Sequence, residues 1–403
     1  MAKLVQYISP VLPVDVTEAA LALETEGRLE RLVTRGDMSS GQRKFAARIP
    51  GLRGVARRPA NPVRSNHRAS YWQADLVEAV ARRTGSTRAA SVDKSFAWLD
   101  RKAAGCLTEH TGAVLAREDA CQAVFTAARQ RGIATLYQLP TVFYQTVREL
   151  MEHETELFPG ACTSASEPDE YAPARCGRKD RELALADWVL CHCAFVRQSV
   201  ERAGFPVGRI MTIPFGVDAG RWSANPERKG KVFLYVGNIT LRKGAHRLLK
   251  AWKALGAHRT HTLRLVGDMQ LAPTFLQDYR GMYEHVPRMP RDELARHYQE
   301  ASAFVFNSMA DGFGHVFAEA MACGTAVLCS RNSGAPEMVA DGVEGRLFGF
   351  GDDDQLGSVL DWSLSHPDDL KEMGRAARIR AEECSWAHFG SSLVSWIDGI
   401  LPT

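Results

Sequence analysis

The 403-residue sequence lacks long apolar runs. A helix that crosses a membrane needs about 18 or more consecutive apolar residues, and no such run occurs. The N-terminus has no cleavable leader pattern, and its apolar stretch "KLVQYIS" is short enough to be a first β-strand. These absences favour a soluble, cytoplasmic protein.

Strong net charge and paired cysteines are also absent. The net charge is +3, and neither zinc-type cysteine pairs nor an aromatic RNA-binding motif occurs, so nothing in the sequence indicates a nucleic-acid partner. The nine cysteines stand at irregular spacings, which favours small core residues in a reducing compartment. The triplet "CHC" at residues 191–193 leaves metal ligation as the less favoured alternative.

Charge is uneven in one segment, residues 42–68, which has eight cations and no Asp or Glu. The cations are Arg43, Lys44, Arg48, Arg53, Arg57, Arg58, Arg64 and Arg68. A solvated loop is the simpler interpretation. The functional alternative is a surface for anionic lipid head groups or an anionic acceptor, which would make the protein peripheral to the inner face of a membrane.

The chain is long enough for two domains, and no internal repeat of fixed period occurs. In the first half, residues 3–9 and the stretch "IATLYQLP" from residue 133 are predicted strands, and residues 16–32 and 72–83 are predicted helices. The Pro- and Gly-rich stretch 206–226 is the predicted domain boundary.

The stretch 304–330, "FVFNSMADGFGHVFAEAMACGTAVLCS", contains a lone carboxylate in an apolar helix. Between Gly312 and Cys329, Glu319 is the one formally charged side chain. A buried glutamate is rare unless it is paired or bound to a ligand, so Glu319 pairs with a distant arginine or meets a ligand. The glycines before the helix favour a ligand, because bare N–H groups at a helix N-terminus attract an anion.

A second glycine loop, "VGNITLRKGAHRLLKAW", follows an apolar strand. It contains Gly237, the adjacent cations Arg242 and Lys243, and Gly244 at the start of a helix. Paired cations beside a glycine loop suit a diphosphate. The loop is neither a Walker loop nor a G-x-G-x-x-G fingerprint.

The second half of the chain alternates apolar strands with helices. Strands are predicted at 231–237, 262–267, 303–307 and 325–330, and helices near 244–255, 292–301 and 314–323. This pattern predicts a parallel sheet covered on both faces, which binds ligands outside the carboxyl ends of its strands. Both glycine loops should therefore face one crevice, and together they describe a site for a nucleotide sugar.

Several blocks between about residues 183 and 386 resemble retaining glycosyltransferases of family 4. They include "IPFGVD", "LYVGNITLRKGAHRLLKAW", "VPRMPRDELARHYQEA" and "DGFGHVFAEAMACGTAVLCSRNSGAPEMVADGVEGRLF". The resemblance implies an α/β GT-B architecture of two Rossmann-like domains with parallel sheets facing a central cleft. Residues 1–205 would bind the acceptor and 206–385 the nucleotide-sugar donor, with a crossover helix at about 386–403 returning to the first domain.

The resemblance also implies roles for single residues. Glu319 would hold the ribose hydroxyls, Asp311 stands where the family has its first glutamate, and Lys243 would stabilise the departing diphosphate. Arg242 would supply the charge of an arginine that the family often has where this chain has Asn238. The implied donor-binding residues are Gly237, Asn238, Gly312, Phe313, Gly314, His315, Val316, Phe317, Val286, Pro287 and Arg288.

The acceptor side is less well marked. The family often has a histidine where this chain reads "LYQLP", which leaves Gln138 as the nearest counterpart. His110 and His153 are further candidates, although a structural role is the simpler interpretation for each.

The implied activity is the retaining, metal-independent transfer of a sugar from a UDP- or GDP-sugar to a saccharide or lipid-linked acceptor, as in polysaccharide biosynthesis. No cofactor is expected besides this co-substrate. Because Asp311, Asn238 and Gln138 depart from the family pattern, an inactive GT-B homologue that binds a nucleotide or a partner enzyme stays as the alternative. A nucleotide-sugar epimerase is disfavoured by the cationic loop.

Overall fold

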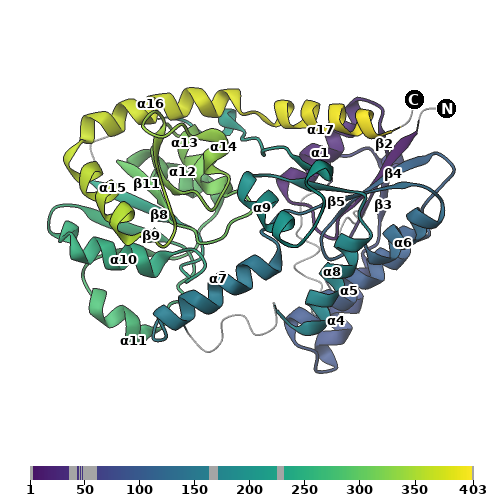
Figure 1. Cartoon of the computed structure of the whole chain (residues 1–403), viewed down its shortest axis with the longest axis horizontal. Coiled ribbons are helices and arrows are strands. Elements are labelled where there is room, and N and C mark those ends of the chain that lie inside the picture. Colours follow the sequence, from purple (N-terminus) through teal and green to yellow (C-terminus); the bar gives the residue numbers. More distant parts are fainter. Residues whose placement is uncertain are drawn as a thin grey trace.

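The computed structural model of the chain describes residues 3–35, 43–44, 46, 48, 61–162, 171–224 and 231–401. These residues form two lobes side by side, each built on a parallel sheet with helices on its faces (Figure 1). The predicted α/β fold with two parallel sheets is confirmed. Within the basic segment 42–68, Arg53, Arg57 and Arg58 lie outside the described residues.

The first lobe has a seven-stranded sheet in the order β3-β2-β1-β4-β5-β6-β7. Its strands are β1 (Leu4–Ile8), β2 (Leu29–Thr34), β3 (Arg68–Ser70), β4 (Thr111–Arg117), β5 (Ala134–Gln138), β6 (Trp188–Cys191) and β7 (Ile210–Thr212). Its helices are α1 (Val14–Thr25), α4 (Gln73–Arg83), α5 (Arg88–Ala104), α6 (Gln122–Gln130), α7 (Tyr144–Leu157), α8 (Pro173–Ala184) and α9 (Ala194–Arg202). Strand β7 belongs to this sheet although it lies beyond residue 205.

The structure corrects the helix that was predicted at residues 16–32. Helix α1 ends at Thr25, and Gly27 follows with a φ of +64°, a left-handed conformation that glycine adopts without steric cost. The chain then forms β2, which pairs in parallel with β1. Leu32 and Val33 are fully buried in this strand. The prediction was wrong because it extended the helical spacing of apolar residues across the turn at Gly27.

The second lobe has a six-stranded sheet in the order β10-β9-β8-β11-β12-β13. Its strands are β8 (Val232–Val236), β9 (Thr262–Val266), β10 (Glu284–Val286), β11 (Ala303–Phe306), β12 (Ala326–Ser330) and β13 (Gly345–Phe348). Its helices are α10 (Ala245–Ala254), α11 (Pro273–Leu276), α12 (Arg291–Glu300), α13 (His315–Ala322), α14 (Ala335–Met338), α15 (Asp353–Ser365) and α16 (Pro367–Glu383). The predicted strands and helices of this half are confirmed, whereas β10 and β13 were not predicted.

Two segments connect the lobes besides the linker after β7. Helix α16 runs along the top of the second lobe and leads into α17 (Trp386–Ile400), which lies on the first lobe (Figure 1). Helices α17 and α1 pack so closely that a Cβ on Gly390 would lie 2.7 Å from Cβ of Ala22.

Helix α7 is the other connection. It begins in the first lobe, where Phe143 N–H donates to Ser199 Oγ at 2.9 Å. It then extends towards the second lobe (Figure 1), where Ala161, just beyond its end, is fully buried in the core of that lobe. Ala272 N–H donates to the Ala161 carbonyl at 3.0 Å. Part of the segment before residue 205 therefore packs with the second sheet.

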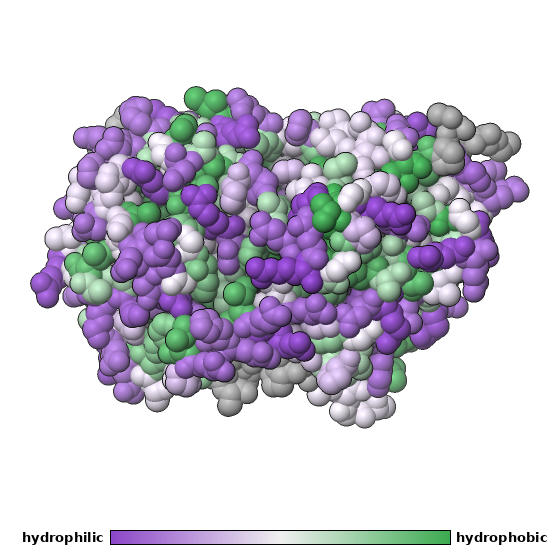
Figure 2. Space-filling model, in the orientation of Figure 1, coloured by the Kyte–Doolittle hydropathy of each residue, from purple (hydrophilic) through white to green (hydrophobic). Residues whose placement is uncertain are grey.

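The visible surface is mostly hydrophilic, with small, scattered hydrophobic areas (Figure 2). Within the described ranges, no helix combines the length and the apolar character that crossing a bilayer requires.

Candidate functional site

The loops after β8 and β11 are joined to each other at the carboxyl edge of the second sheet. Met309 N–H donates to the Arg242 carbonyl at 2.9 Å, and Arg242 Nη1 donates to the Ala310 carbonyl at 3.3 Å. Gly244 has a φ of +70°, and a Cβ there would lie 1.7 Å from the Asn307 carbonyl oxygen. The two loops therefore lie side by side at this edge, whereas their facing one crevice stays a prediction.

Lys243 and Asp311 form an ion pair between these two loops. The exposed fractions of their side chains are 20% and 14%. Burial lowers the pKa of Lys243, against the opposing charge of Asp311. Burial raises the pKa of Asp311, but the charge and hydrogen bond of Lys243 outweigh burial and bring it below the usual value. Each partner therefore stabilises the charged form of the other.

Glu319 lies on α13 and is 4% exposed. Its Oε1 pairs with Arg291 Nη2 at 2.7 Å, and its Oε2 accepts a hydrogen bond from Tyr298 OH at 3.0 Å. Burial raises the pKa of Glu319, and the charge of Arg291 opposes that rise. The lone carboxylate is therefore paired with an arginine, one of the two alternatives that the sequence left open.

A cavity of about 690 Å³ lies against Glu319 and between the lobes. Both lobes, the linker after β7 and the α16–α17 connection contribute to its wall. The polar and aromatic lining residues include Glu18, Asp218, Arg221, Arg291, His315, Glu319 and Trp386. The volume falls in the range of ordinary ligand pockets.

The remaining predicted residues of the loop after β11 and of helix α13 lie either in the core or at the cavity. Phe313 is 2% exposed and Phe317 is fully buried, so their rings belong to the core and the loop presents backbone groups. Gly314 caps α13 with a φ of +97°. The His315 ring lines the cavity and stacks on Phe215, with 5.1 Å between ring centroids.

Other predicted donor-binding residues lie at the ends of the neighbouring strands. Gly237 N–H donates to the Val266 carbonyl and Gly267 N–H to the Val286 carbonyl, each at 2.9 Å. A Cβ on Gly267 would lie 1.9 Å from the Gly237 carbonyl oxygen, so no larger residue fits there. Of the other predicted residues here, Val316 is half-buried and Asn238, Pro287 and Arg288 are exposed.

Gln138 is fully buried in the first lobe. Its Oε1 accepts a hydrogen bond from Tyr7 OH at 2.6 Å, and its Nε2 lies 3.2 Å from His192 Nε2. His192 Nδ1 lies 3.0 Å from the Ile213 carbonyl, and burial lowers the pKa of His192 to about 3. Because the carbonyl requires a donor, this neutral ring carries its proton on Nδ1. The structure therefore places Gln138 in a core network.

His110 and His153 are not brought together with the other candidates. His110 directly precedes β4, at the amino edge of the first sheet. The candidate loops of the second lobe follow the carboxyl ends of strands. His153 is exposed on α7, next to the buried Glu154.

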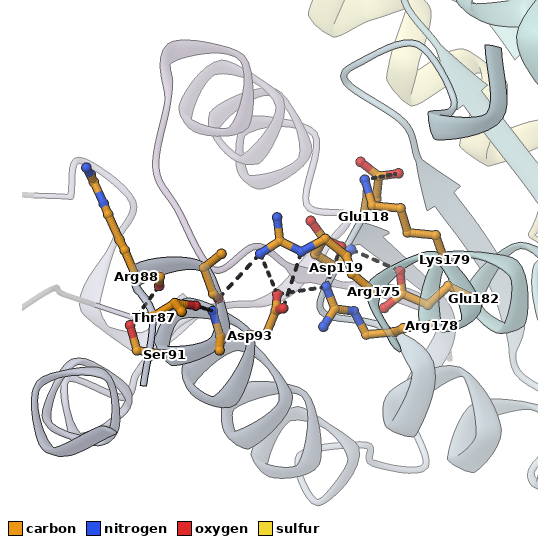
Figure 3. Close-up of polar contacts among 12 residues, drawn as sticks. Thr87, Arg88, Ser91, Asp93, Glu118, Asp119, Arg175, Arg178, Lys179 and Glu182 are labelled. Atoms are coloured by element: carbon orange, nitrogen blue, oxygen red, sulfur yellow. Dashed lines mark hydrogen bonds and ion pairs between the residues drawn. The ribbon is translucent and has the colours of Figure 1, made fainter. Parts of the chain in front are cut away.

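A charged network that the sequence did not predict lies where β4 ends (Figure 3). Asp119, with a φ of +77°, pairs with Arg178 at 2.6 Å, and Glu118 pairs with Lys179 at 3.1 Å. Glu182 accepts the Asp119 N–H at 2.9 Å, and burial together with the Asp119 charge raises its pKa to about 8. This network fixes the loop after β4.

The lobes touch beside the donor loop. Cys193 Sγ donates to the Gly312 carbonyl at 3.2 Å, and Ala194 N–H donates to Glu337 Oε1 at 2.5 Å. A Cβ on Gly312 would lie 1.8 Å from the Pro140 carbonyl oxygen.

Metal ligation by the "CHC" triplet was the less favoured alternative. Burial raises the thiol pKa of Cys193 to about 12. In the described part of the chain, no three His, Cys, Asp or Glu side chains are placed to hold a metal ion.

Arg291 and Tyr298 are the site residues that sequence reasoning missed. Seven positions separate them on α12, so both side chains lie on one face of that helix. The block "VPRMPRDELARHYQEA" contains both residues, but no residue pattern in it indicates that they contact Glu319.

Comparison with known proteins shows what this chain is similar to. Residues 218–380 match the family model of glycosyl transferases group 1. D-inositol 3-phosphate glycosyltransferase of Thermobifida fusca is 28% identical over 306 residues, which cover 70% of this chain and 66% of that protein. The GDP-mannose-dependent alpha-(1-6)-phosphatidylinositol monomannoside mannosyltransferase of Mycolicibacterium smegmatis is 27% identical over 53% of this chain and 63% of that protein. The chain thus spans somewhat less than two thirds of these curated relatives.

Solved structures share the fold over nearly the whole chain. Sucrose-phosphate synthase from Thermosynechococcus elongatus covers 99% of both chains with a TM-score of 0.68 and 18% identity. HepE from Anabaena, in complex with UDP-glucose, covers 98% of this chain and 99% of its own with a TM-score of 0.60 and 14% identity. The chain therefore has the GT-B fold of these solved structures, and its residues 218–380 match the family model of glycosyl transferases group 1.

Proposed function

We propose that the protein is a retaining, metal-independent glycosyltransferase that moves a sugar from a UDP- or GDP-sugar to a saccharide or lipid-linked acceptor. The observation that carries the proposal is the pairing of two charged features at one sheet edge. The Lys243–Asp311 pair joins the two glycine loops, and Glu319, on the helix that follows the second loop, lines the cavity. The names of relatives and the UDP-glucose complex of a fold neighbour support a nucleotide-sugar donor.

Lys243 and Arg242 supply the positive charge in this account. As the bond between the anomeric carbon and the diphosphate breaks, negative charge grows on the leaving phosphate. Cations and N–H groups already aimed at that position stabilise the transition state more than the ground state. Asp311 holds Lys243 by an ion pair, which orients its ammonium.

Asp311 and Glu319 bind hydroxyl groups in the same account. The Asp311 carboxylate, with its pKa held below the usual value, accepts a hydrogen bond from the donor sugar. Glu319 accepts hydrogen bonds from the ribose. The leaving phosphate takes the proton of the attacking acceptor hydroxyl, so no protein group need act as a strong base.

The acceptor binds on the first lobe, across the cleft from these loops. A lipid-linked acceptor would bring the protein to a membrane surface. Leu76 and Val80 on α4 support that contact, because they are 38% and 53% exposed and lie four positions apart on one helix face. Arg83, seven positions after Leu76 and three after Val80, follows on the same face of the helix and would meet anionic head groups.

Replacement of Lys243 tests the proposal. Purified protein is incubated with UDP-glucose or GDP-mannose and a panel of saccharide acceptors, and release of the nucleoside diphosphate is followed. Lys243→Ala should lower turnover by at least about 10²-fold, because it removes charge stabilisation of the leaving group. Lys250→Ala is the matched control, since Lys250 is 54% exposed on α10 and pairs with Asp353.

Turnover by Lys243→Ala close to that of the wild type would remove Lys243 from the site. Nucleotide binding without turnover for any tested donor and acceptor would favour the inactive homologue.

A further inference from the structure

The carboxylate of Glu319 is held from one helix. Arg291, at the N-terminus of α12, contacts Oε1 at 2.7 Å, and Tyr298, two turns later, contacts Oε2 at 3.0 Å. Tyr298 is fully buried, whereas the side chain of Arg291 is 45% exposed and lines the cavity. The tyrosine contact therefore belongs to the core, and the arginine contact belongs to the wall of the site.

We propose that Arg291 is a positioning residue for the donor: it keeps the Glu319 carboxylate ionised and aimed into the cavity, where that carboxylate accepts hydrogen bonds from the ribose. This inference rests on the proposed function and adds a specific role for Arg291. Arg291 touches the carboxylate and acts through it. An ionised carboxylate has about four acceptor positions, so it can hold Arg291 and Tyr298 and still accept from a diol.

The need for a nearby cation follows from burial. A carboxylate removed from water favours its neutral form unless a positive charge lies within hydrogen-bond distance. A neutral carboxyl has a proton on one oxygen and makes weaker hydrogen bonds than a charged acceptor.

Arg291 contacts Glu319 directly, and its charge lowers the pKa of Glu319 more than that of Arg221 does. Arg221, on η3 (Ala219–Arg221), is bonded to Asp292 at 2.8 Å. Arg378 on α16 donates to backbone carbonyls, including that of Trp222 at 2.6 Å. The ionisable groups that face Glu319 or line its cavity are Glu18 on α1, Asp218 and Arg221 around η3, Arg291 and Tyr298 on α12, His315 and Cys323 on and just after α13, and Arg378 and Glu382 on α16.

The test measures the affinity for UDP between pH 6 and pH 8.5 by calorimetry. The proteins are the wild type, Arg291→Gln, Arg291→Lys and the control Arg296→Gln. Arg296 lies on the same helix, is 82% exposed and pairs with Glu300. Comparison at each pH removes the titration of UDP itself, because all four proteins bind the same ligand.

Arg291→Gln should bind UDP within about threefold of the wild type at pH 8.5. It should then lose up to about tenfold in affinity for each pH unit as the pH falls, because Glu319 must first lose a proton. Arg291→Lys and Arg296→Gln should follow the wild type. A loss in Arg291→Gln that is equal at every pH, or no loss at all, would overturn the inference.

A measurement without nucleotide separates this inference from the proposed function. Infrared spectra of Arg291→Gln and of Arg291→Gln/Glu319→Gln are subtracted at pH 6. A protonated-carboxyl band that is absent from the corresponding difference between wild type and Glu319→Gln would support the ionising role. Equal spectra in both comparisons would overturn it. If the wild type binds none of UDP, GDP and ADP, the proposed function falls, and the role of Arg291 in donor binding falls with it.

Discussion

His192 illustrates how a single buried side chain ties the linker to the first sheet. Its ring stacks on Phe215, with 3.7 Å between centroids, and its Nδ1 hydrogen donates to the Ile213 carbonyl. Phe215 in turn stacks on His315 at the cavity. The neutral ring is therefore part of the packing that holds the linker beside the site.

Because burial lowers the pKa of His192 to about 3, this residue should make stability depend on pH. Below about pH 6.5 the unfolded chain binds a proton that the folded chain cannot bind until about pH 3, so folding stability falls as the pH falls through this window. The free energy of unfolding of the wild type should decrease by up to about 1.4 kcal/mol per pH unit more than that of His192→Gln.

Urea denaturation at several pH values between 4 and 6.5 measures this difference. The slope against pH is compared, because the substitution itself changes the stability at every pH. Parallel curves for the two proteins would show that His192 gains a proton in the folded state.

At the scale of residues, the sequence predicted the charged groups better than their partners. Glu319 and Lys243 were selected as candidates because a lone carboxylate in an apolar helix and a cation pair beside a glycine are locally unusual. Arg291 was not found, because its contact with Glu319 forms between residues 28 positions apart in the chain, on two helices whose packing depends on the whole sheet. Gln138 was placed at the acceptor by resemblance, whereas burial assigns it to the core.

Among the elements, helix α7 joins the lobes by a buried ionic contact. Glu154 is 1% exposed, and its Oε1 lies 2.5 Å both from His246 Nε2 and from Arg247 Nε. His246 and Arg247 lie in the first turn of α10, directly after the loop that contains Lys243. Helix α7 therefore fixes the start of the helix on which the cationic loop depends.

Glu154→Ala should lower the free energy of unfolding by about 1–3 kcal/mol, because it leaves His246 and two nitrogens of Arg247 buried without an acceptor, although Asp353 still pairs with Arg247 Nη1. The exposed neighbour Glu152 is the control, since its side chain is 67% exposed and its pairing with Arg148 spans 3.8 Å. Glu152→Ala should change stability by less than about 0.5 kcal/mol. The midpoints of chemical denaturation measure both effects. Equal shifts for the two variants would show that the buried contact contributes nothing specific.

Helices and strands were predicted well where a single periodicity of apolar residues continued without interruption. The strands of the second lobe are apolar runs bounded by glycine or polar residues, and β8, β9, β11 and β12 were all found. Strand β2 was missed because "LERLVT" continues the apolar spacing of α1 across Gly27. Strand β10 has three residues, two of them exposed, so its pairing with β9 left no apolar signal.

At the scale of the whole molecule, the arrangement of the lobes could not be read from the sequence. The contact of Gly312 with Pro140 and the hydrogen bond from Cys193 join residues more than 100 positions apart. The position of α17 on α1 was expected from a resemblance and not from any local pattern. The cavity to which both lobes contribute is lined by α1, the linker after β7, α12, α13 and the α16–α17 connection, which only the folded arrangement brings together.

The central claim is that this cavity binds the nucleotide of a sugar donor through Glu319. Thermal unfolding of the wild type and of Glu319→Ala, each with UDP, GDP or ADP at about 100 times the dissociation constant, tests it most directly. At that concentration a ligand stabilises the folded state by about 2.7 kcal/mol, which raises the unfolding midpoint by several degrees. Such a shift is expected with one nucleotide in the wild type, together with its loss in Glu319→Ala. An equal shift in both proteins, or no shift with any nucleotide in the wild type, would contradict it.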